Sequence, residues 1–212
     1  MEIILRLEEE KDCRAVDEVT REAFWNVHQP GCDEHLLIHK LRGEREFVKD
    51  LDFVAVFDNR IVGNIVYVQS KIRDVDGVEY TVLTFGPVSV LPEYQHKGIG
   101  SKLIRHTMQL SREMGYRAIL IYGEPEYYKR FGFIESIKYG ITNKDGKYPA
   151  ALLVLELYEG ALDGINGVFD EGDIYQVDRA ELESFDKAFP VKEMLSGTRS
   201  QLRFDEMVGK YL

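Results

Sequence analysis

Residues 88–101 read VSVLPEYQHKGIGS, and this stretch decides how the chain is expected to fold. It starts as the end of a β-rich run and finishes with two glycines placed just before a helical pattern. A helix that starts at such a loop leaves several backbone N–H groups unpaired, and these groups attract an anion. Gly98 and Gly100 leave room for phosphates beside the backbone, while Lys97 and Ser101 offer a charge and a hydroxyl.

The residues on either side complete a βαβ unit. Apolar side chains recur at helical spacing from Ser101 to Met114, and Gly115 is placed to end that helix. Residues 118–122 are a continuous apolar run, which is typical of a strand covered on both faces. Strand, glycine loop, helix and strand therefore follow one another between residues 88 and 122.

The rest of the chain supplies further elements. We expect an opening strand, a helix capped by Asp12, a second short helix that starts near Asp33, and a hairpin of residues 53–57 and 61–68. The run 78–90 is interrupted at Gly86-Pro87, and the stretch 150–158 is apolar again. In the tail, residues 178–187 are expected to form a helix whose apolar side chains must pack on another part of the protein; these are Leu182, Phe185 and Phe189.

Two common phosphate-binding loops do not fit the glycine pattern. A dinucleotide-binding G-x-G-x-x-G loop needs a third glycine where Leu103 stands, and a Walker loop needs a G-K-[ST] sequence that is missing here. A G-x-G before a helix is also compatible with a plain tight turn. Its wider context separates these interpretations.

That context resembles the acetyl-CoA signature of the GNAT acetyltransferase superfamily, roughly V-x-P-x-x-Q-x-x-G-x-G before a helix. Five residues hold the signature positions, namely Val90, Pro92, Gln95, Gly98 and Gly100. The resemblance implies an α/β fold with a mixed, splayed sheet flanked by helices. It covers residues 1–158, taken as the acetyltransferase domain, and leaves 159–212 as a carboxy-terminal extension packed on that domain.

The resemblance also implies a cofactor site for acetyl-CoA. Because proline cannot donate to a ladder, the strand is expected to part from its neighbour near Pro87 and to leave backbone groups for the pantetheine arm. The loop would wrap the pyrophosphate. The cofactor-binding residues implied are Val88, Val90, Gln95, His96, Lys97, Gly98, Ile99, Gly100 and Ser101.

A second motif follows at residues 123–133, GEPEYYKRFGF, which resembles the closing segment of the same family. By that resemblance Tyr128 points at the cofactor sulfur and is the catalytic residue, a proton donor to the departing thiolate. On a helix Tyr127 would face about 100° away, toward the core or the substrate mouth. The short loop Gly123-Glu124-Pro125 looks like that of the bacterial YhbS-like branch.

The base that neutralises the attacking amine is not assigned. Thr84 stands where protein-lysine acetyltransferases of this superfamily carry a glutamate, and Ile121 or its neighbours stand where many relatives carry an asparagine. The remaining candidates are each also explained as surface charges or polar loop residues; they are Glu22, Glu79, Glu124, His28, His35 and His39.

Composition limits the partners. The net charge is −10 over 212 residues, which disfavours nucleic acid as a partner. We expect a cytoplasmic protein without a membrane segment, because the start lacks an export signal and no apolar run is long enough to span a bilayer. Cys13 and Cys32 form no metal or disulfide pattern, and no metal is implied.

The function predicted is transfer of the acetyl group of acetyl-CoA to a primary amine, on a small molecule or a peptide, by direct attack. Two alternatives stay open: a non-catalytic acyl-CoA-binding or regulatory module, and an acyltransferase that uses a longer acyl-CoA. A homodimer also stays open, and the amine itself is not identified.

Overall fold

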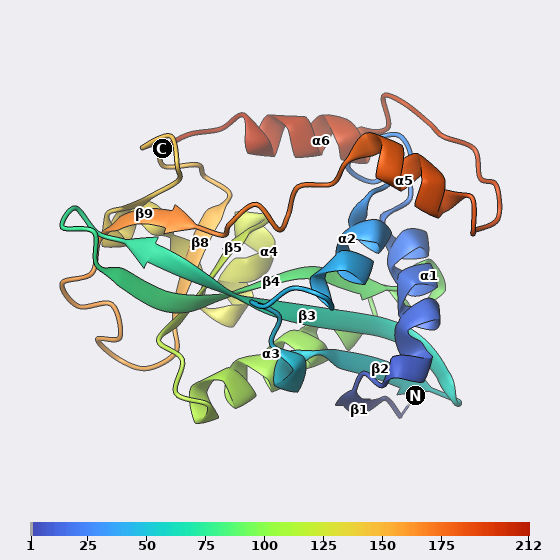
Figure 1. The fold of residues 1–212 in the computed structure, drawn as a ribbon, viewed down its shortest axis with the longest axis horizontal. Coiled ribbons are helices and arrows are strands. Elements are labelled where there is room, and N and C mark those ends of the chain that lie inside the picture. The colour runs from blue at the N-terminus through green and yellow to red at the C-terminus, as the bar shows by residue number, and fades with distance from the viewer. Residues whose placement is uncertain (1) are drawn as a thin grey trace.

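A computed structural model describes residues 2–212 (Figure 1). The helices and strands follow the chain in the order β1 (Ile4–Leu7), α1 (Cys13–Phe24), α2 (Glu34–Leu41), β2 (Phe53–Phe57), β3 (Arg60–Arg73), β4 (Glu79–Val90), α3 (Ile99–Glu113), β5 (Ala118–Tyr122), α4 (Pro125–Tyr128), β6 (Ile134–Glu135), β7 (Ile141–Thr142), β8 (Leu152–Glu156), β9 (Gly167–Asp170), α5 (Arg179–Asp186) and α6 (Arg199–Val208).

The nine strands described form one mixed sheet in the order β1-β2-β3-β4-β5-β8-β6, and β9 joins it by pairing with β3 and β7. Strand β4 is antiparallel to β3 over most of its length, from Glu79 to Val90. It is parallel to β5, but only Leu83 pairs there, with Ile119. Beyond Leu83 the two strands diverge, so the sheet is splayed at its centre.

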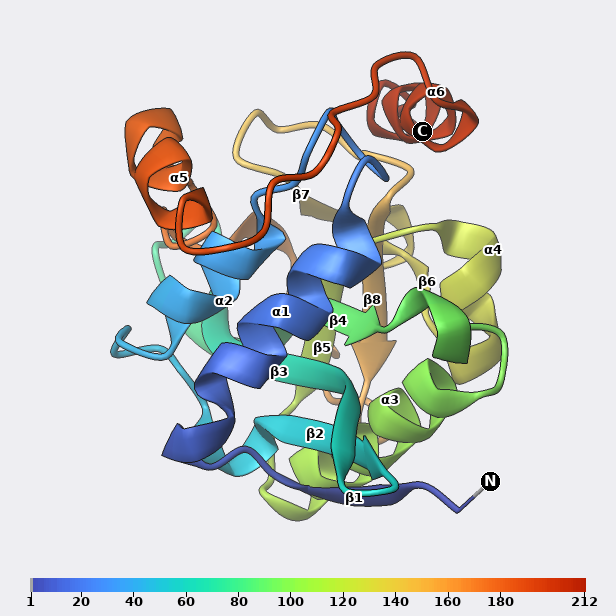
Figure 2. The ribbon, with the colours of Figure 1, turned by 90° about the vertical axis from the view of Figure 1, so that its right-hand side faces the viewer.

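Helices cover both faces of this sheet (Figure 2). Helices α1 and α2 lie on one face, and α3 and α4 lie on the other. The main core fills the space between them, and a smaller core lies beside β8 and β9. The predicted α/β class, the mixed splayed sheet and the helices on both faces are confirmed.

Most predicted elements are present with shifted ends. The hairpin's second strand runs to Arg73 rather than to residue 68, because its outer end pairs with both β4 and β9. The last strand of the predicted set is Leu152–Glu156 within the apolar stretch 150–158. Strands β6, β7 and β9 and helix α6 were not predicted, since each is short or weakly patterned.

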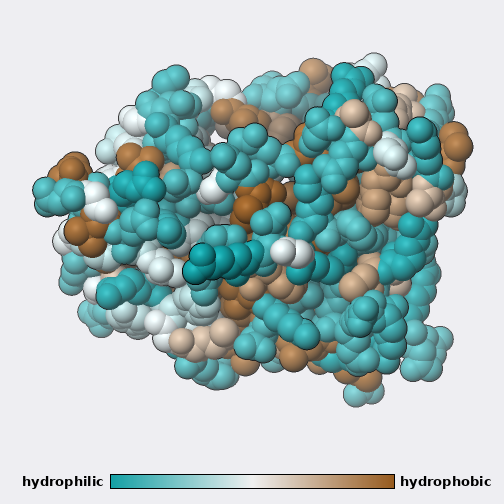
Figure 3. Space-filling model, in the orientation of Figure 1, coloured by the Kyte–Doolittle hydropathy of each residue, from teal (hydrophilic) through white to brown (hydrophobic). Residues whose placement is uncertain are grey.

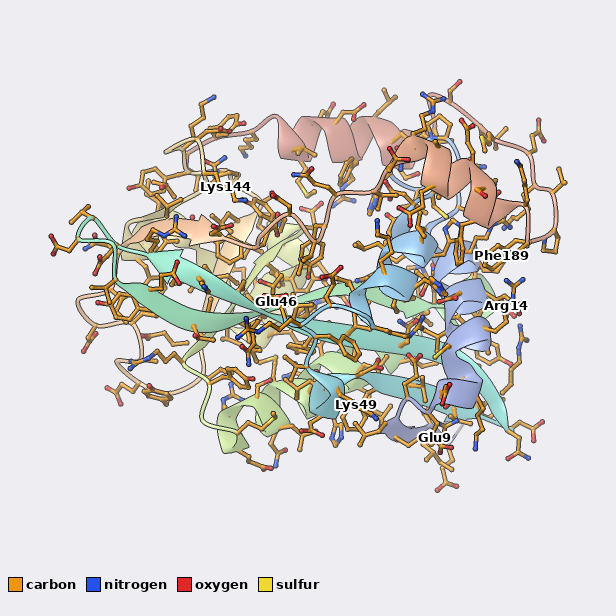
Figure 4. The ribbon with its side chains drawn as sticks, viewed as in Figure 1. Glu9, Arg14, Glu46, Lys49, Lys144 and Phe189 are labelled. Atoms are coloured by element: carbon orange, nitrogen blue, oxygen red, sulfur yellow. The ribbon has the colours of Figure 1, made fainter. Side chains whose placement is uncertain are left out.

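The segment after residue 158 is tied to the rest of the chain at several points. Strand β9 pairs with β3 through Asp170 opposite Lys71. Farther on, the guanidinium of Arg14 lies 3.8 Å from the centroid of the Phe189 ring, and both side chains are seen beside α1 in Figure 4. Phe189 is buried, and the rings of Phe185 and Phe189 lie 5.5 and 5.2 Å from that of His35 on α2.

A buried ionic contact holds α5 against α1. The carboxylate of Asp186 accepts two hydrogen bonds from Arg21, at 2.7 and 3.0 Å, and its Oδ1 lies 3.1 Å from Nε2 of His35. Arg21 is only 1% exposed, and His35 is fully buried. A buried guanidinium needs such a partner, because losing one leaves an uncompensated charge out of water.

We therefore expect Asp186→Ala to lower the free energy of unfolding by about 3 kcal/mol, since Arg21 would stay buried without its carboxylate. Chemical denaturation monitored by circular dichroism measures this. Glu183→Ala on the same helix is the matched control, because Glu183 is 69% exposed and pairs only with Arg179. Its loss should stay below about 0.5 kcal/mol. Equal losses for both variants would show that the Arg21 contact does not hold the tail in place.

Candidate active site

The glycine loop presents a row of unpaired backbone amides. Gly98 is the N-cap of α3 and has a φ of 83°, a left-handed conformation that glycine adopts without strain. The first helical bond runs from the amide of Lys102 to the carbonyl of Gly98. Within residues 2–212, the amides of 96–101 donate to no protein acceptor. They converge at the positive end of a helix dipole, which favours a phosphate.

The side chains of this loop contribute less than its backbone. Ile99 is buried in the core, so only its amide faces the site. His96 is exposed with a φ of 60°. The ammonium of Lys97 donates to the carbonyl of Glu93 at 2.7 Å, so its contact with a phosphate requires that hydrogen bond to break.

The divergence of β4 from β5 leaves the backbone of Val88 and Val90 facing the gap. The Leu91 amide donates to the Val62 carbonyl, which makes that pair a hydrogen-bonded one in the β3–β4 ladder. Hydrogen-bonded and non-hydrogen-bonded pairs alternate in antiparallel strands. Val90 and Val88 therefore direct their N–H and C=O groups away from β3. The Gln95 side chain donates to the Val90 carbonyl at 3.0 Å, which leaves the groups of Val88 and the Val90 amide available.

Tyr128 lies where the two strands have parted. Its ring packs against the backbone of Gly123 so closely that a Cβ on Gly123 would lie 2.4 Å from a ring carbon. The rings of Phe85 and Phe133 lie 5.9 and 5.7 Å from it. Within residues 2–212 the Tyr128 hydroxyl forms no hydrogen bond to another protein group. Burial, with a smaller effect of Tyr127, raises its pKa, so the phenol keeps its proton at neutral pH.

Tyr127 packs against the main core and lines the cavity beside Tyr128, as the sequence led us to expect. Its hydroxyl also lies 3.6 Å from the position that a Cβ would take on Gly100, so it reaches the glycine loop as well. The guanidinium of Arg130 lies 4.4 Å from the centroid of its ring. Both tyrosines line the cavity, with the Tyr127 hydroxyl toward the glycine loop and Tyr128 in the gap between the strands.

A cavity of about 580 Å³ opens beside Tyr128. Three parts of the chain line it: the diverging ends of β4 and β5 with α4, the α1–α2 region, and the carboxy-terminal segment. Helix α6 lies over it, through Phe204 stacked 4.3 Å from His28 and Arg203 2.8 Å from Glu124. In Figure 3 apolar side chains come to the surface beneath the carboxy-terminal segment.

The structure sorts the six candidates for a base. Only Glu124 and His28 line the cavity, and each is engaged, Glu124 with Arg203 and His28 with Glu34 at 2.9 Å. Four lie elsewhere with partners of their own, namely Glu22 with Lys192, Glu79 with Lys71 and Arg73, His35 with Asp186, and His39 with Asp17.

Thr84 lines the cavity but is committed elsewhere, because its hydroxyl lies 2.6 Å from that of Ser70. Ile121 is a buried core residue of β5. Sequence reasoning missed Glu171 and Tyr175, which reach the cavity from the segment after β9. No local motif marks them, since their place depends on how β9 pairs.

Neither cysteine is activated. Burial raises the pKa of the Cys13 thiol to about 11 and also raises that of Cys32, and neither residue lines the cavity. The part of the chain that the structure describes contains no cluster of histidine, cysteine and carboxylate side chains suited to a metal ion. Over the same residues, no helix is long and apolar enough to cross a membrane.

The chain is similar to known acetyltransferases in sequence and in fold. Residues 50–135 match the acetyltransferase (GNAT) domain family. The uncharacterized N-acetyltransferase YhbS of Escherichia coli K12 is 27% identical over 169 residues, which cover 79% of this chain and 95% of that protein. The crystal structure of E. coli YhbS in complex with CoA matches with a TM-score of 0.70 at 23% identity, covering 82% of this chain and 91% of that one.

A GNAT family acetyltransferase from Brucella melitensis, whose crystal structure is a complex with acetyl-CoA, matches with a TM-score of 0.67. It is 27% identical, and the match covers 82% of this chain and 99% of that one. The matched residues contain β4, the glycine loop, α3, β5 and α4, which carry the free loop amides, the strand gap and Tyr128. Residues 50–135 therefore match a GNAT acetyltransferase domain, and over most of its length the chain is similar to YhbS.

Proposed function

We propose that this GNAT acyltransferase moves the acetyl group of acetyl-CoA to a primary amine by direct attack. One observation carries the proposal: the free amides of residues 96–101, the outward-facing backbone of Val88 and Val90, and the phenol of Tyr128 lie in sequence along the gap between β4 and β5. A phosphate, an extended amide-containing arm and a thioester follow one another in the same order in acetyl-CoA.

Each part of the cofactor then has a counterpart. The pyrophosphate is held by the amides of 96–101 with the hydroxyl of Tyr127 close by. The pantetheine arm lies along β4 and bonds to Val88 and Val90 as an added strand does. This arrangement is supported by the solved complexes of YhbS with CoA and of the Brucella protein with acetyl-CoA.

Tyr128 supplies the proton that the leaving group needs. Attack on the thioester gives a tetrahedral intermediate that expels a thiolate, and a phenol donates to it in the transition state. Tyrosine and thiol pKa values are about 10 and 8.5 in water. Burial raises the pKa of Tyr128, but removal from water disfavours the departing thiolate for the same reason, so the phenol can still donate to the sulfur. The absence of a protein acceptor for the Tyr128 hydroxyl, within the described chain, leaves that proton free for the sulfur.

Direct attack is favoured over a covalent acyl-enzyme. Both thiols have raised pKa values and lie outside the cavity, so neither offers the thiolate that such a step requires. We also propose that residues 159–212 are an extension of the 1–158 acetyltransferase domain that faces the acceptor, because Glu171, Tyr175 and α6 line the cavity beyond Tyr128.

Gly100→Val should weaken acetyl-CoA binding at least about tenfold, or about 1.4 kcal/mol, because its methyl groups fill the space above the loop amides. Calorimetric titration with acetyl-CoA measures this. Gly100→Ala is the matched variant: its Cβ would lie 3.6 Å from Tyr127 and 3.7 Å from Val90, which are ordinary contacts, so it should bind more tightly than valine. Wild-type affinity in a folded Gly100→Val protein would place the phosphates elsewhere.

Tyr128→Phe should leave the acetyl-CoA dissociation constant nearly unchanged, because the ring still packs on Gly123, while kcat falls about 10²- to 10⁴-fold. Steady-state thiol release with an accepted amine measures kcat. Tyr127→Phe gives the opposite split, a weaker affinity for acetyl-CoA with a smaller effect on kcat, because its hydroxyl faces the phosphate loop. Unchanged turnover in Tyr128→Phe would rule out the proton-donor role.

A further inference from the structure

Three carboxylates line the cavity beside Tyr128, and they differ in how they are paired. Glu34 lies 2.9 Å from His28, and Glu124 lies 2.8 Å from Arg203. Glu171, the first residue after β9, has no hydrogen bond or ion pair from its side chain to any group in residues 2–212. The cavity therefore contains one carboxylate that is free to receive a cation.

A second polar group of the cavity also lacks a protein partner among the described residues. The hydroxyl of Tyr175 lines the same cavity, is buried, and has no hydrogen-bond partner among the described residues. A buried hydroxyl without a partner costs free energy, which a bound polar group recovers. An amine placed between Glu171 and Tyr175 offers N–H donors to both oxygens.

The rest of the cavity suits an apolar body rather than a polar one. Its walls carry aromatic and aliphatic side chains from all three parts of the chain, including Phe24, Val27, Leu37, Phe204 and Met207. Helix α6 lies over the cavity. The volume of the cavity, about 580 Å³, fits a compact molecule. Apolar walls with a few placed polar groups are typical of small-molecule sites.

We infer that Glu171 receives the ammonium group of a compact, apolar primary amine and then takes a proton from it, as the general base of the transfer. This inference rests on the proposed function and adds the acceptor class and the base. It places the base on the carboxy-terminal segment, opposite the cofactor gap and its proton donor Tyr128.

The electrostatic environment suits this role. Burial raises the pKa of Glu171 to about 7, with a smaller contribution from Asp170, while Lys144 acts in the opposite direction. Lys144 itself lies 2.9 Å from Asp170, so its charge is already paired. Tyr122 of β5 and Tyr175 are the other titratable groups that interact with Glu171. A base with a pKa near the operating pH is the most effective one.

The proton balance closes with these two residues. The Glu171 carboxylate takes one proton from the ammonium, whose pKa of about 10.4 in water falls in an apolar site. The nitrogen lone pair forms the C–N bond, the C–S bond breaks, and the thiolate takes the Tyr128 proton. The resulting phenolate takes the second proton from the amide nitrogen, and Glu171 releases its proton to solvent. The net products are an N-acetyl amine, CoA thiol and one proton.

Binding is tested on the full-length protein saturated with CoA, by calorimetric titration with 2-phenylethylamine and with 2-phenylethanol. The two probes share a body and differ in the cation. Glu171→Gln should weaken amine binding at least about tenfold and leave alcohol binding unchanged. Asp173→Asn is the matched control, since Asp173 is 82% exposed and lies outside the cavity, and it should bind both probes as wild type does. Equal amine affinity in wild type and Glu171→Gln overturns the inference.

Kinetics test the base. For wild type, kcat/KM for 2-phenylethylamine should rise with pH through a pKa of about 7, because the free carboxylate is the active form. In Glu171→Gln this rise of kcat/KM with pH should be absent, and kcat should fall about 10²-fold, while the KM for acetyl-CoA stays unchanged. If the Glu171→Gln variant keeps the rise of kcat/KM with pH, Glu171 is not the base. Acetylation of peptide or polar amines, with 2-phenylethylamine refused, overturns the acceptor class.

Failure of the proposed function itself looks different. Wild-type protein would then release no thiol with any primary amine, or would not bind acetyl-CoA. In contrast, a wild type that acetylates amines and a Glu171→Gln variant that does so equally well leave the function intact and refute only the base.

Discussion

The parting of β4 from β5 after the single pair Leu83–Ile119 is the constraint on which the site depends. A strand that loses a neighbour exposes unpaired backbone groups and would normally fray or attract another chain. Here β4 stays in place because β3 pairs with it from Glu79 to Val90, and β5 stays in place because β8 pairs with all of it. The gap is therefore rigid, and its free backbone groups can act as a preformed receptor for an extended arm.

Strand β3 extends the same constraint to the acceptor side. Its inner part pairs with β2 and β4, and its outer end, at residues 71–73, pairs with β4 and β9. Glu171 directly follows the residue that lies opposite Lys71. The position of this carboxylate relative to β4 is thus set by strand pairing rather than by a loose loop. A site held on regular elements keeps its groups in place more accurately than one held on loops alone.

The sequence predicts those parts of the structure that depend on interactions between residues close together in the chain. The glycine loop, α3 and β5 depend on near neighbours along the chain, so their pattern predicted the βαβ unit. The helix begins at Ile99 rather than near Ser101, so Gly100 lies in its first turn. Tyr128 was chosen because residues 123–133 resemble the closing segment of the family, and its catalytic role stays a prediction. Tyr127 faces the core and the cavity as predicted, but the approach of its hydroxyl to Gly100 was missed, because a helical angle does not place a side chain relative to a separate loop.

Glu171 and Tyr175 were beyond sequence reasoning for a different reason. Strand β9 is four residues long, and its position comes from pairing with β3, about a hundred positions earlier in the chain. The apolar pattern of α6 is also weak. The helix is held by separate contacts on its two sides, Phe204 with His28 and Arg203 with Glu124. Long-range contacts of this kind leave no periodic signal in the segment that makes them.

One physical effect gives the two proposed catalytic groups their different protonation states. Removal from water disfavours the charged form of any acid, so it raises the pKa of both Tyr128 and Glu171. For a phenol, whose pKa is already about 10 in water, the result is a proton held securely at neutral pH. For a carboxyl group the same effect brings the pKa to about 7, where both forms coexist. A single apolar cavity thus keeps the Tyr128 phenol protonated on the cofactor side and leaves the Glu171 carboxyl able to accept a proton on the amine side, and within residues 2–212 neither side chain forms an ion pair.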